Sequence, residues 1–393
     1  MFLIGKQKNI LKKLVDSGIL VDSHTEELED LELIRNDYIN NFRLQICILP
    51  TEKCNFRCVY CYENFKYGEM TLETKMALLL WIKKNIKYYS GLEISWFGGE
   101  PLLAKDTIYF LSEKIIDICK TAKKPFAASI TTNGSLMDVD TFRKLLKCHI
   151  TSFQVTLDGT EESHDKLKVK ADGSGTYKII MQNLINIKQE VHSAIFRFVI
   201  RTNVTKDVVL HMPNHIEKLN TIFGNDKRFM FYFRPVGRWG DSKVVGIEDE
   251  LLGSFDSIYT PLLKSNIVLN CSIYQNMLED QICFAAQRNQ YVIRPDGRIA
   301  KCTMLLEHDE NAIGYLLADG TMKIDSAKLQ KWVIPSKQLS DKCKKCNMVL
   351  SCMERSCPAK GYVLQSNMCG YEGRSYNYIL QLLDKNNLFE NID

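Results

Sequence analysis

The sequence predicts an α/β protein, a partial (βα)6 TIM-like barrel followed by a small cysteine-rich domain. Six short apolar segments between residues 43 and 233 alternate with helical patterns, and strands separated by helices form parallel sheets with right-handed crossovers. Polar residues follow the end of each expected strand, where barrel enzymes build their active sites. After about residue 250 the helical alternation gives way to Asp-Gly hairpins and clustered cysteines.

The barrel elements follow from local patterns. The expected strands cover residues 43–49, 92–97, 126–132, 152–157, 195–202 and 229–233. A helix is expected from Leu72 to Tyr88, with Thr71 as its N-cap, and another from Lys105 to Cys119. The expected barrel spans residues 42–245.

The two flanking parts have different patterns. Residues 1–41 suggest a helical or winged-helix-like segment, with a short strand at 18–22 and an acidic helix at 25–39. Residues 246–393 form the expected second domain. Two Asp-Gly hairpins are expected at 291–302 and 313–324, and a closing helix near 375–383.

The composition describes a soluble globular protein of 393 residues, 45% apolar and 25% charged. A formal charge of +4 is too small and too diffuse to indicate a nucleic-acid partner. No apolar run reaches about eighteen residues, so no membrane span is expected. The first apolar run breaks at Lys6 without a cleavage site, which predicts a cytoplasmic protein.

Fourteen cysteines are unevenly distributed. In a reducing cytosol they favour metal binding or catalysis over disulfides. Cys47, Cys119 and Cys148 lie in apolar segments and are expected to be buried structural thiols. The others form a group at residues 54–61 and a second group between residues 271 and 369.

The first group lies in "TEKCNFRCVYCYEN", residues 51–64. Thiolates suit iron–sulfur clusters, and a [4Fe–4S] cubane needs one ligand for each iron. Three cysteines leave one iron open to a small molecule. The alternative is structural zinc, but this metal prefers four protein ligands, and His24 is the nearest histidine.

Cys-x3-Cys-x2-Cys after a first barrel strand, with Tyr60 before the last cysteine, resembles the radical S-adenosylmethionine (SAM) superfamily. The resemblance implies that Cys54, Cys58 and Cys61 bind a catalytic [4Fe–4S] cluster whose open iron chelates S-adenosyl-L-methionine. An electron from the cluster would then cleave the sulfonium to methionine and a 5′-deoxyadenosyl radical. That radical would remove a hydrogen atom from an unactivated carbon.

The resemblance also implies cofactor contacts along the strand ends. They are Tyr62, Gly98, Gly99, Glu100, Thr132, Asn133 and Lys168. Glycines let a backbone approach a ligand closely, and Glu100 would accept hydrogen bonds from the methionine ammonium. Lys168 replaces the more usual arginine, so it can neutralise a carboxylate without a bidentate contact. A solvated surface lysine is the alternative.

The second group resembles the SPASM extension of radical enzymes that modify peptides and proteins. It implies two auxiliary [4Fe–4S] clusters, hence three in all. One would bind Cys271, Cys283, Cys302 and Cys357, and the other Cys343, Cys346, Cys352 and Cys369. The long gap between Cys271 and Cys283 leaves open whether Cys271 is a ligand or that cluster keeps an open iron. Zinc ribbons are the alternative.

The nearest resemblances are to anaerobic sulfatase maturases and to maturases of ribosomally made peptides. Sulfatase maturases carry an aspartate, their proposed base, where Thr303 follows Cys302. A threonine hydroxyl is no general base near neutral pH, although Glu307 or Asp309 could replace it. We therefore expect a radical maturase that forms a thioether or carbon–carbon crosslink in a ribosomal peptide.

Two alternatives remain open, a formylglycine-generating sulfatase maturase and a non-catalytic zinc-binding adaptor. The expected partners are a peptide or protein substrate, whose leader the N-terminal segment could bind by strand addition. A flavodoxin or ferredoxin-type electron donor is also implied by the resemblance.

Overall fold

The computed structural model describes residues 24–236, 255–265, 283–333 and 341–346, with isolated positions 349, 358, 359 and 381. Ten strands form one sheet in the order β10-β9-β8-β7-β1-β2-β3-β4-β5-β6. The strands are β1 (Leu44–Ile48), β2 (Leu92–Trp96), β3 (Phe126–Thr132), β4 (Ile150–Thr156), β5 (Arg197–Val204), β6 (Phe229–Pro235), β7 (Gln290–Ile293), β8 (Arg298–Ala300), β9 (Ala312–Leu316) and β10 (Met322–Ile324).

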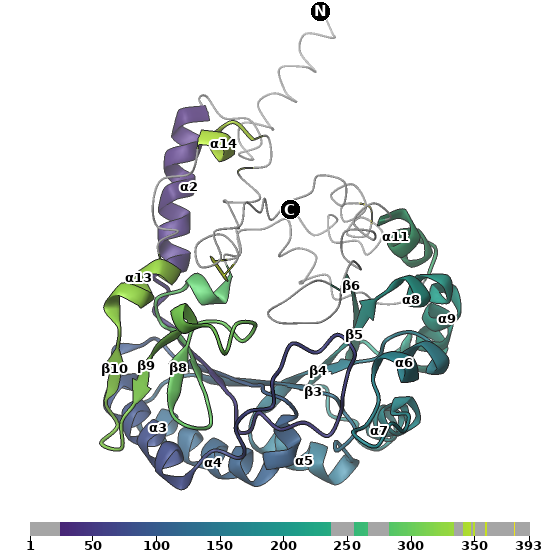
Figure 1. The fold of residues 1–393 in the computed structure, drawn as a ribbon, viewed down its shortest axis with the longest axis horizontal. Helices are drawn as coiled ribbons and strands as arrows, with labels where there is room; N and C mark the ends of the chain where they lie inside the picture. Colours follow the sequence, from purple (N-terminus) through teal and green to yellow (C-terminus); the bar gives the residue numbers. More distant parts are fainter. Residues whose placement is uncertain are drawn as a thin grey trace, which may run out of the picture.

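Strands β1 to β6 are parallel neighbours, which confirms the six-stranded α/β barrel sheet. The α-helices are α2 (His24–Ile39), α3 (Leu72–Asn85), α4 (Lys105–Thr121), α5 (Val139–Lys147), α6 (Glu161–Leu167), α7 (Tyr177–Glu190), α8 (Lys206–Leu210), α9 (Met212–Phe223), α11 (Phe255–Lys264), α13 (Ser326–Val333) and α14 (Asp341–Lys344). Figure 1 shows α3, α4, α5, α7 and α9 around the outside of the curved sheet.

Helix α3 begins as the sequence predicts. The Thr71 side chain accepts a hydrogen bond from the Thr74 backbone N–H, which caps the helix at its first turn. Its buried face, which includes Leu78, Trp81 and Ile82, joins the main core. The last expected turn forms instead as a short 3-10 helix, η1 (Ile86–Tyr88).

Both Asp-Gly hairpins form, as β7–β8 and β9–β10. However, β7 also pairs in parallel with β1 and extends the barrel sheet on its other side. The Gln45 N–H donates to Asn289 O, and the Leu49 N–H donates to Ile293 O. The sheet is therefore continuous across the expected domain boundary at residue 245, and the domain division itself stays a prediction.

Cys47, Cys119 and Cys148 are all buried, as expected for structural thiols. Burial raises the pKa of Cys119 to about 11 and raises the pKa of the other two as well. The acidic helix forms as α2. The expected strand at 18–22, the closing helix apart from position 381, and Cys271, Cys352, Cys357 and Cys369 lie outside the described residues. Across the described ranges, no helix combines the length and apolar character that a bilayer crossing requires.

Candidate active site

The cysteine loop, residues 49–71, connects β1 to α3 and is tied at both ends. Its base closes through an antiparallel bridge between Thr51 and Glu69 and through the Met70 N–H, which donates to Pro50 O. Its far side pairs with the end of α6 and the segment after it, because the Val59 N–H donates to Leu167 O at 3.0 Å and the Arg57 N–H donates to Val169 O at 2.8 Å. The loop therefore crosses from the β1 edge to the rim beyond β4.

The three thiols of this loop are partly buried. The Phe56 N–H donates to the Cys54 Sγ at 3.3 Å, and the Glu63 N–H donates to the Cys61 Sγ at 3.4 Å. Burial raises the pKa of Cys54 to about 12 and that of Cys61 to about 11. Bound metal deprotonates such thiols, and backbone N–H donors to sulfur are a recurring feature of iron–sulfur sites.

The loop offers three thiol donors, and thiolates are the soft ligands that suit iron–sulfur clusters. A [4Fe–4S] cluster needs its thiolates at separate irons rather than around one point. Cys54, Cys58 and Cys61, partly buried on one loop, therefore fit the cluster.

Gly98 and Gly99 pack directly against the backbone of the cysteine loop. Gly98 has φ of +124°, and a Cβ there would lie 2.2 Å from Thr51 O. A Cβ on Gly99 would lie 2.4 Å from Glu52 O and 2.5 Å from Lys53 O. The two glycines let the β2 rim pack against the loop backbone, a role that we did not predict. Their expected contact with a cofactor stays a prediction.

Glu100 is fully buried, and three donors hold its carboxylate. Its Oε1 accepts from the Leu102 N–H at 3.0 Å and from the Thr132 hydroxyl at 2.7 Å, and its Oε2 accepts from the Asn133 N–H at 2.7 Å. Burial raises the pKa of Glu100, and these hydrogen bonds oppose the rise. The structure thus brings three predicted cofactor contacts into one network.

Asn133 extends this network to the cysteine loop. Its amide donates to the Asn55 Oδ1 at 2.8 Å, and Asn55 lies directly after Cys54. The Asn55 amide in turn donates to the Ser135 hydroxyl. The carboxyl ends of β2 and β3 are therefore linked by hydrogen bonds to the cysteine loop.

Lys168 is only 4% exposed, which rules out a solvated surface lysine. Its positive charge acts on Cys58, Cys61, Glu100 and Asp158, and lowers the pKa of each against the larger effect of burial. Among the described residues, its ammonium has no hydrogen-bond or ion-pair partner in the structure. It remains a predicted contact for the cofactor carboxylate.

Tyr60, before the third cysteine, is held by a network that sequence analysis missed. Its hydroxyl donates to the fully buried Asp158 at the end of β4 and accepts from the Asn203 amide of β5. Asp158 also accepts from the Asn203 N–H at 2.8 Å. The strand-end motifs containing Asp158 and Asn203 were visible in the sequence, but their pairing with Tyr60 was not.

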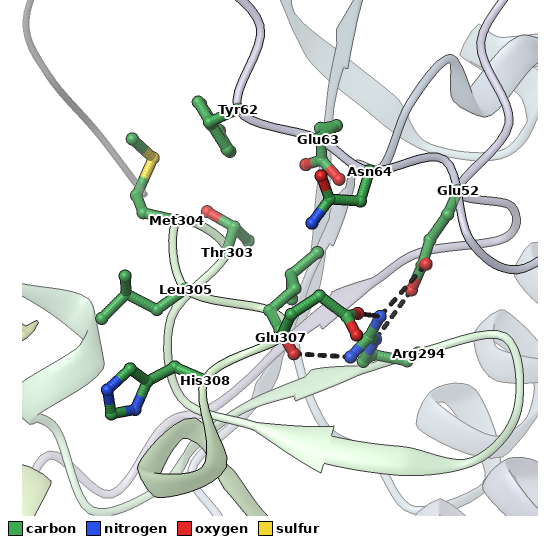
Figure 2. Close-up of a pocket in the computed structure, with 11 residues that line it drawn as sticks. Glu52, Tyr62, Glu63, Asn64, Arg294, Thr303, Met304, Leu305, Glu307 and His308 are labelled. Atoms are coloured by element: carbon green, nitrogen blue, oxygen red, sulfur yellow. Dashed lines mark hydrogen bonds and ion pairs between the residues drawn. The ribbon is translucent and has the colours of Figure 1, made fainter. Parts of the chain in front are cut away.

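A cavity of about 150 Å³ separates the cysteine loop from the loop that follows β8. Tyr62, Glu63 and Asn64 form one wall, and residues 303–308 form the opposite wall (Figure 2). Burial, with smaller contributions from Glu52 and Glu307, raises the pKa of Glu63 to about 8. Tyr62 therefore lies in a cavity beside Cys61, and its predicted cofactor contact stays a prediction.

Arg294 joins the two walls of this cavity. It follows β7 and is 1% exposed. Its Nε donates to the Glu52 Oε1 at 2.7 Å, and its terminal nitrogens donate to Leu306 O and to Glu307 (Figure 2). The sequence offered no signal for this role beyond a charged residue after an apolar run.

The suggested replacements for a base near Thr303 have different environments. Glu307 is bound by both Arg294 and Lys66, and these contacts lower its pKa against the opposing effect of burial. A paired carboxylate with a lowered pKa is a weak proton acceptor near neutral pH. Asp309 begins the 3-10 helix η4 (Asp309–Asn311) and does not line the cavity. Glu63, which was not predicted, lines the cavity together with Thr303.

Of the predicted auxiliary ligands, Cys283, Cys302, Cys343 and Cys346 lie in described residues. Cys302 is buried, and its Sγ accepts from the Met304 N–H at 3.3 Å. The Asn311 side chain fixes the Cys302 backbone, because it accepts a hydrogen bond from the Cys302 N–H and donates one to the Cys302 carbonyl. Cys343 and Cys346 lie at α14, joined by a backbone hydrogen bond. The two auxiliary ligand sets stay predictions.

Comparisons with known proteins agree with this geometry. Residues 48–212 match the family model described as the radical SAM superfamily. The chain is 24% identical over 337 residues to a cysteine-type anaerobic sulfatase-maturating enzyme of Clostridium novyi, covering 79% of this chain and 86% of that protein. It is 23% identical over 324 residues to the radical SAM cyclopropyl synthase TigE of Paramaledivibacter caminithermalis, covering 75% and 66%.

Solved structures share the fold. Native anSMEcpe with bound AdoMet and Cp18Cys peptide superposes with a TM-score of 0.64 at 19% identity, covering 89% of this chain and 100% of that one. Streptococcus suis SuiB bound to its precursor peptide SuiA gives 0.51 at 16% identity, covering 92% and 85%. Residues 48–212 therefore match the radical SAM superfamily, and over most of its length the chain is similar in sequence to a sulfatase-maturating enzyme and in fold to anSMEcpe.

Proposed function

We propose that this radical SAM enzyme modifies a ribosomally made peptide by forming a thioether or carbon–carbon crosslink. The single observation that carries the choice is Thr303, which lines the cavity where a proton acceptor would serve formylglycine formation. The fold shared with anSMEcpe bound to the Cp18Cys peptide, and with SuiB bound to precursor peptide SuiA, supports a peptide substrate.

In this proposal, Cys54, Cys58 and Cys61 hold the radical-generating cluster. When bound, the cluster and S-adenosylmethionine supply a carbon radical that removes a hydrogen atom from the substrate. Lys168 neutralises the cofactor carboxylate. Glu100 keeps the rim of β2 and β3 in place for the methionine end, because its carboxylate already joins Leu102, Thr132 and Asn133.

We further propose two auxiliary clusters bound by the eight downstream cysteines. Three cubanes hold about twelve iron atoms for each chain. Replacing Cys302 by Ala should lower the iron content of anaerobically reconstituted protein, while Cys119→Ala, a buried thiol outside both groups, should leave it unchanged. Zinc in place of iron at these sites would contradict the proposal.

Formylglycine formation is the second candidate, and Glu63 favours it. Glu63 lines the same cavity as Thr303, so a carboxyl group is present on the wall opposite the position where sulfatase maturases carry their aspartate. That arrangement could supply the proton acceptor that Thr303 cannot.

Mass spectrometry separates the two reactions. The enzyme would be co-expressed with short cysteine-containing peptides encoded beside its gene, and separately with a sulfatase encoded there. A crosslinked peptide keeps its sulfur and loses two hydrogen atoms, whereas a formylglycine made from cysteine loses the sulfur. Crosslinked peptide supports the proposal, and formylglycine in either substrate replaces it with the second candidate.

A further inference from the structure

The cavity between the cysteine loop and residues 303–308 is lined by more acidic than basic side chains. Glu52, Glu63 and Glu307 line it, whereas Arg294 is the only lysine or arginine among the described residues of its lining (Figure 2). A cationic ligand can bind there only if one of the three carboxyl groups has no cationic partner within the protein.

Two of the carboxylates already have cationic partners. The Arg294 guanidinium contacts both oxygens of Glu52, at 2.7 and 3.1 Å, and also binds Glu307. Lys66 pairs with the other Glu307 oxygen at 2.9 Å. The remaining guanidinium nitrogen donates to the Leu306 carbonyl. Every side-chain nitrogen of Arg294 thus already donates a hydrogen bond to a residue of the cavity walls.

Glu63 is the acidic side chain that remains. Its Oε1 is buried and has no hydrogen-bond partner among the described residues. Figure 2 shows its side chain extending from the cysteine loop toward the space above Arg294. A buried acceptor without a donor is uncommon in folded proteins, and a ligand that donates a hydrogen bond would satisfy it.

The size of the cavity restricts the ligand. Its volume of about 150 Å³ lies below the roughly 300–1,000 Å³ that pockets for whole small molecules usually span. The cavity therefore suits one group of a larger molecule. Because Tyr62 and Thr303 directly follow Cys61 and Cys302, that group would lie between the two predicted cluster loops.

We propose that this cavity binds a primary alkylammonium group of the substrate, with Glu63 as the hydrogen-bond acceptor. The inference rests on the proposed function for its peptide substrate. The ammonium would belong either to a lysine side chain or to the peptide N-terminus, and it would anchor the peptide beside the reacting residue. Glu63 is thus a specificity-determining residue on this cavity.

Binding of small probes tests the subsite on the full-length, anaerobically reconstituted protein. The probes are n-butylammonium for a lysine side chain, glycinamide for a peptide N-terminus, and n-butanol as the neutral control. Ligand-observed NMR titrations would give the Kd of each probe. We expect one of the two ammonium probes to bind at least about tenfold more tightly than n-butanol, and the better probe identifies the source.

Glu63→Gln should remove this preference, whereas Glu73→Gln, at an exposed glutamate of α3, should preserve it. The comparison of charged and neutral probes on the unmodified protein needs no variant, so it stands even if Glu63→Gln fails to fold. Equal binding of n-butanol, no binding of either ammonium, or an unchanged preference in Glu63→Gln would overturn the proposal.

The same samples separate this inference from the proposed function. Reductive cleavage of S-adenosylmethionine to 5′-deoxyadenosine reports on the radical cluster and does not require the subsite. Cleavage without ammonium binding would reject the subsite alone. Ammonium binding that depends on Glu63, in a protein that fails to modify any peptide, would leave the subsite standing and reject the proposed function.

Discussion

Glu100, at the barrel rim, is fully buried and accepts three hydrogen bonds. Both of its carboxylate oxygens accept from donors that have no access to water. In Glu100→Gln, one oxygen becomes an NH2 group that faces a donor, so at least one bond is lost. A buried group left unsatisfied costs about 1–3 kcal/mol.

We therefore expect Glu100→Gln to lower the free energy of unfolding by about that amount and to weaken binding of S-adenosylmethionine. Urea unfolding of the apo chain and equilibrium dialysis of the reconstituted chain measure the two effects. Glu93→Gln, on the preceding strand β2 and partly exposed, is the matched control. Stability equal to that of the control would show that the three bonds contribute little.

His215, on α9, makes stability depend on pH. It is buried, and its Nε2 lies 2.9 Å from the hydroxyl of Thr202, which donates its own hydrogen to Leu157 O. Nε2 must then carry the hydrogen, which leaves Nδ1 without a hydrogen-bond partner among the described residues. Burial, with a smaller contribution from Lys218, lowers the pKa of His215 to about 3.

The unfolded histidine binds a proton below about pH 6.5, but the folded one does so only near pH 3. Stability should therefore fall as the pH drops from about 6.5, by at most about 1.4 kcal/mol for each pH unit from this residue. Urea unfolding of the apo chain at pH 7, 6 and 5 should show a shallower fall in His215→Leu. Parallel curves for the two proteins would contradict this assignment.

For single residues, the sequence predicted which side chains belong to the site better than it predicted their burial and their neighbours. The cysteines, Glu100 and Asn133 were identifiable because their motifs are local. Lys168 could be interpreted as surface or buried, because its burial depends on the cysteine loop folding over it. Glu63 gave no signal, since an unpartnered carboxylate becomes visible only when residues 303–308 form the opposite wall of its cavity.

At the scale of elements, the cysteine loop depends on close backbone packing against the rim of β2. Gly99→Ala would place a Cβ within 2.5 Å of two backbone oxygens of the loop, and backbone atoms cannot move aside cheaply. We expect lower stability and a lower iron content after reconstitution. Gly68→Ala is the control within the same loop, because a Cβ there meets nothing within 4 Å. Equal iron content in the two variants would refute the packing argument.

Arg294 joins the cysteine loop to the loop after Cys302, because it binds both Glu52 and Glu307. Arg294→Met strands the buried Glu52 carboxylate, and breaking a buried ion pair in this way costs about 3–5 kcal/mol. Adding Glu52→Gln removes the stranded charge and should recover part of that loss. A double-mutant cycle of unfolding free energies measures the coupling. Additive effects would show that the two side chains act independently.

Element boundaries were predictable where capping and periodicity are local, as at Thr71 and along β3. The parallel pairing of β7 with β1 was not predictable. The sequence of β7 indicates a strand, but nothing in four residues shows that it pairs with β1, about 245 residues earlier. Pairing over that distance depends on which sheet edge remains open, which is a property of the whole fold.

At the scale of the whole molecule, one sheet places the two predicted cluster regions at adjacent positions. Because β7 lies beside β1, Arg294 emerges next to the cysteine loop, and the segment that carries Cys302 forms the facing wall. This continuity places the proposed substrate subsite beside the predicted radical-cluster loop. The four cysteines outside the described residues bear on the auxiliary clusters and not on this arrangement.

The central claim is that Cys54, Cys58 and Cys61 hold a cluster with an open iron for S-adenosylmethionine. The most direct test incubates the reconstituted chain anaerobically with S-adenosylmethionine and dithionite and measures 5′-deoxyadenosine by chromatography. The unmodified chain should form it, Cys119→Ala should retain that activity, and replacement of any one of the three loop cysteines by Ala should abolish it. Formation of 5′-deoxyadenosine at an undiminished rate in all three loop variants would contradict the claim.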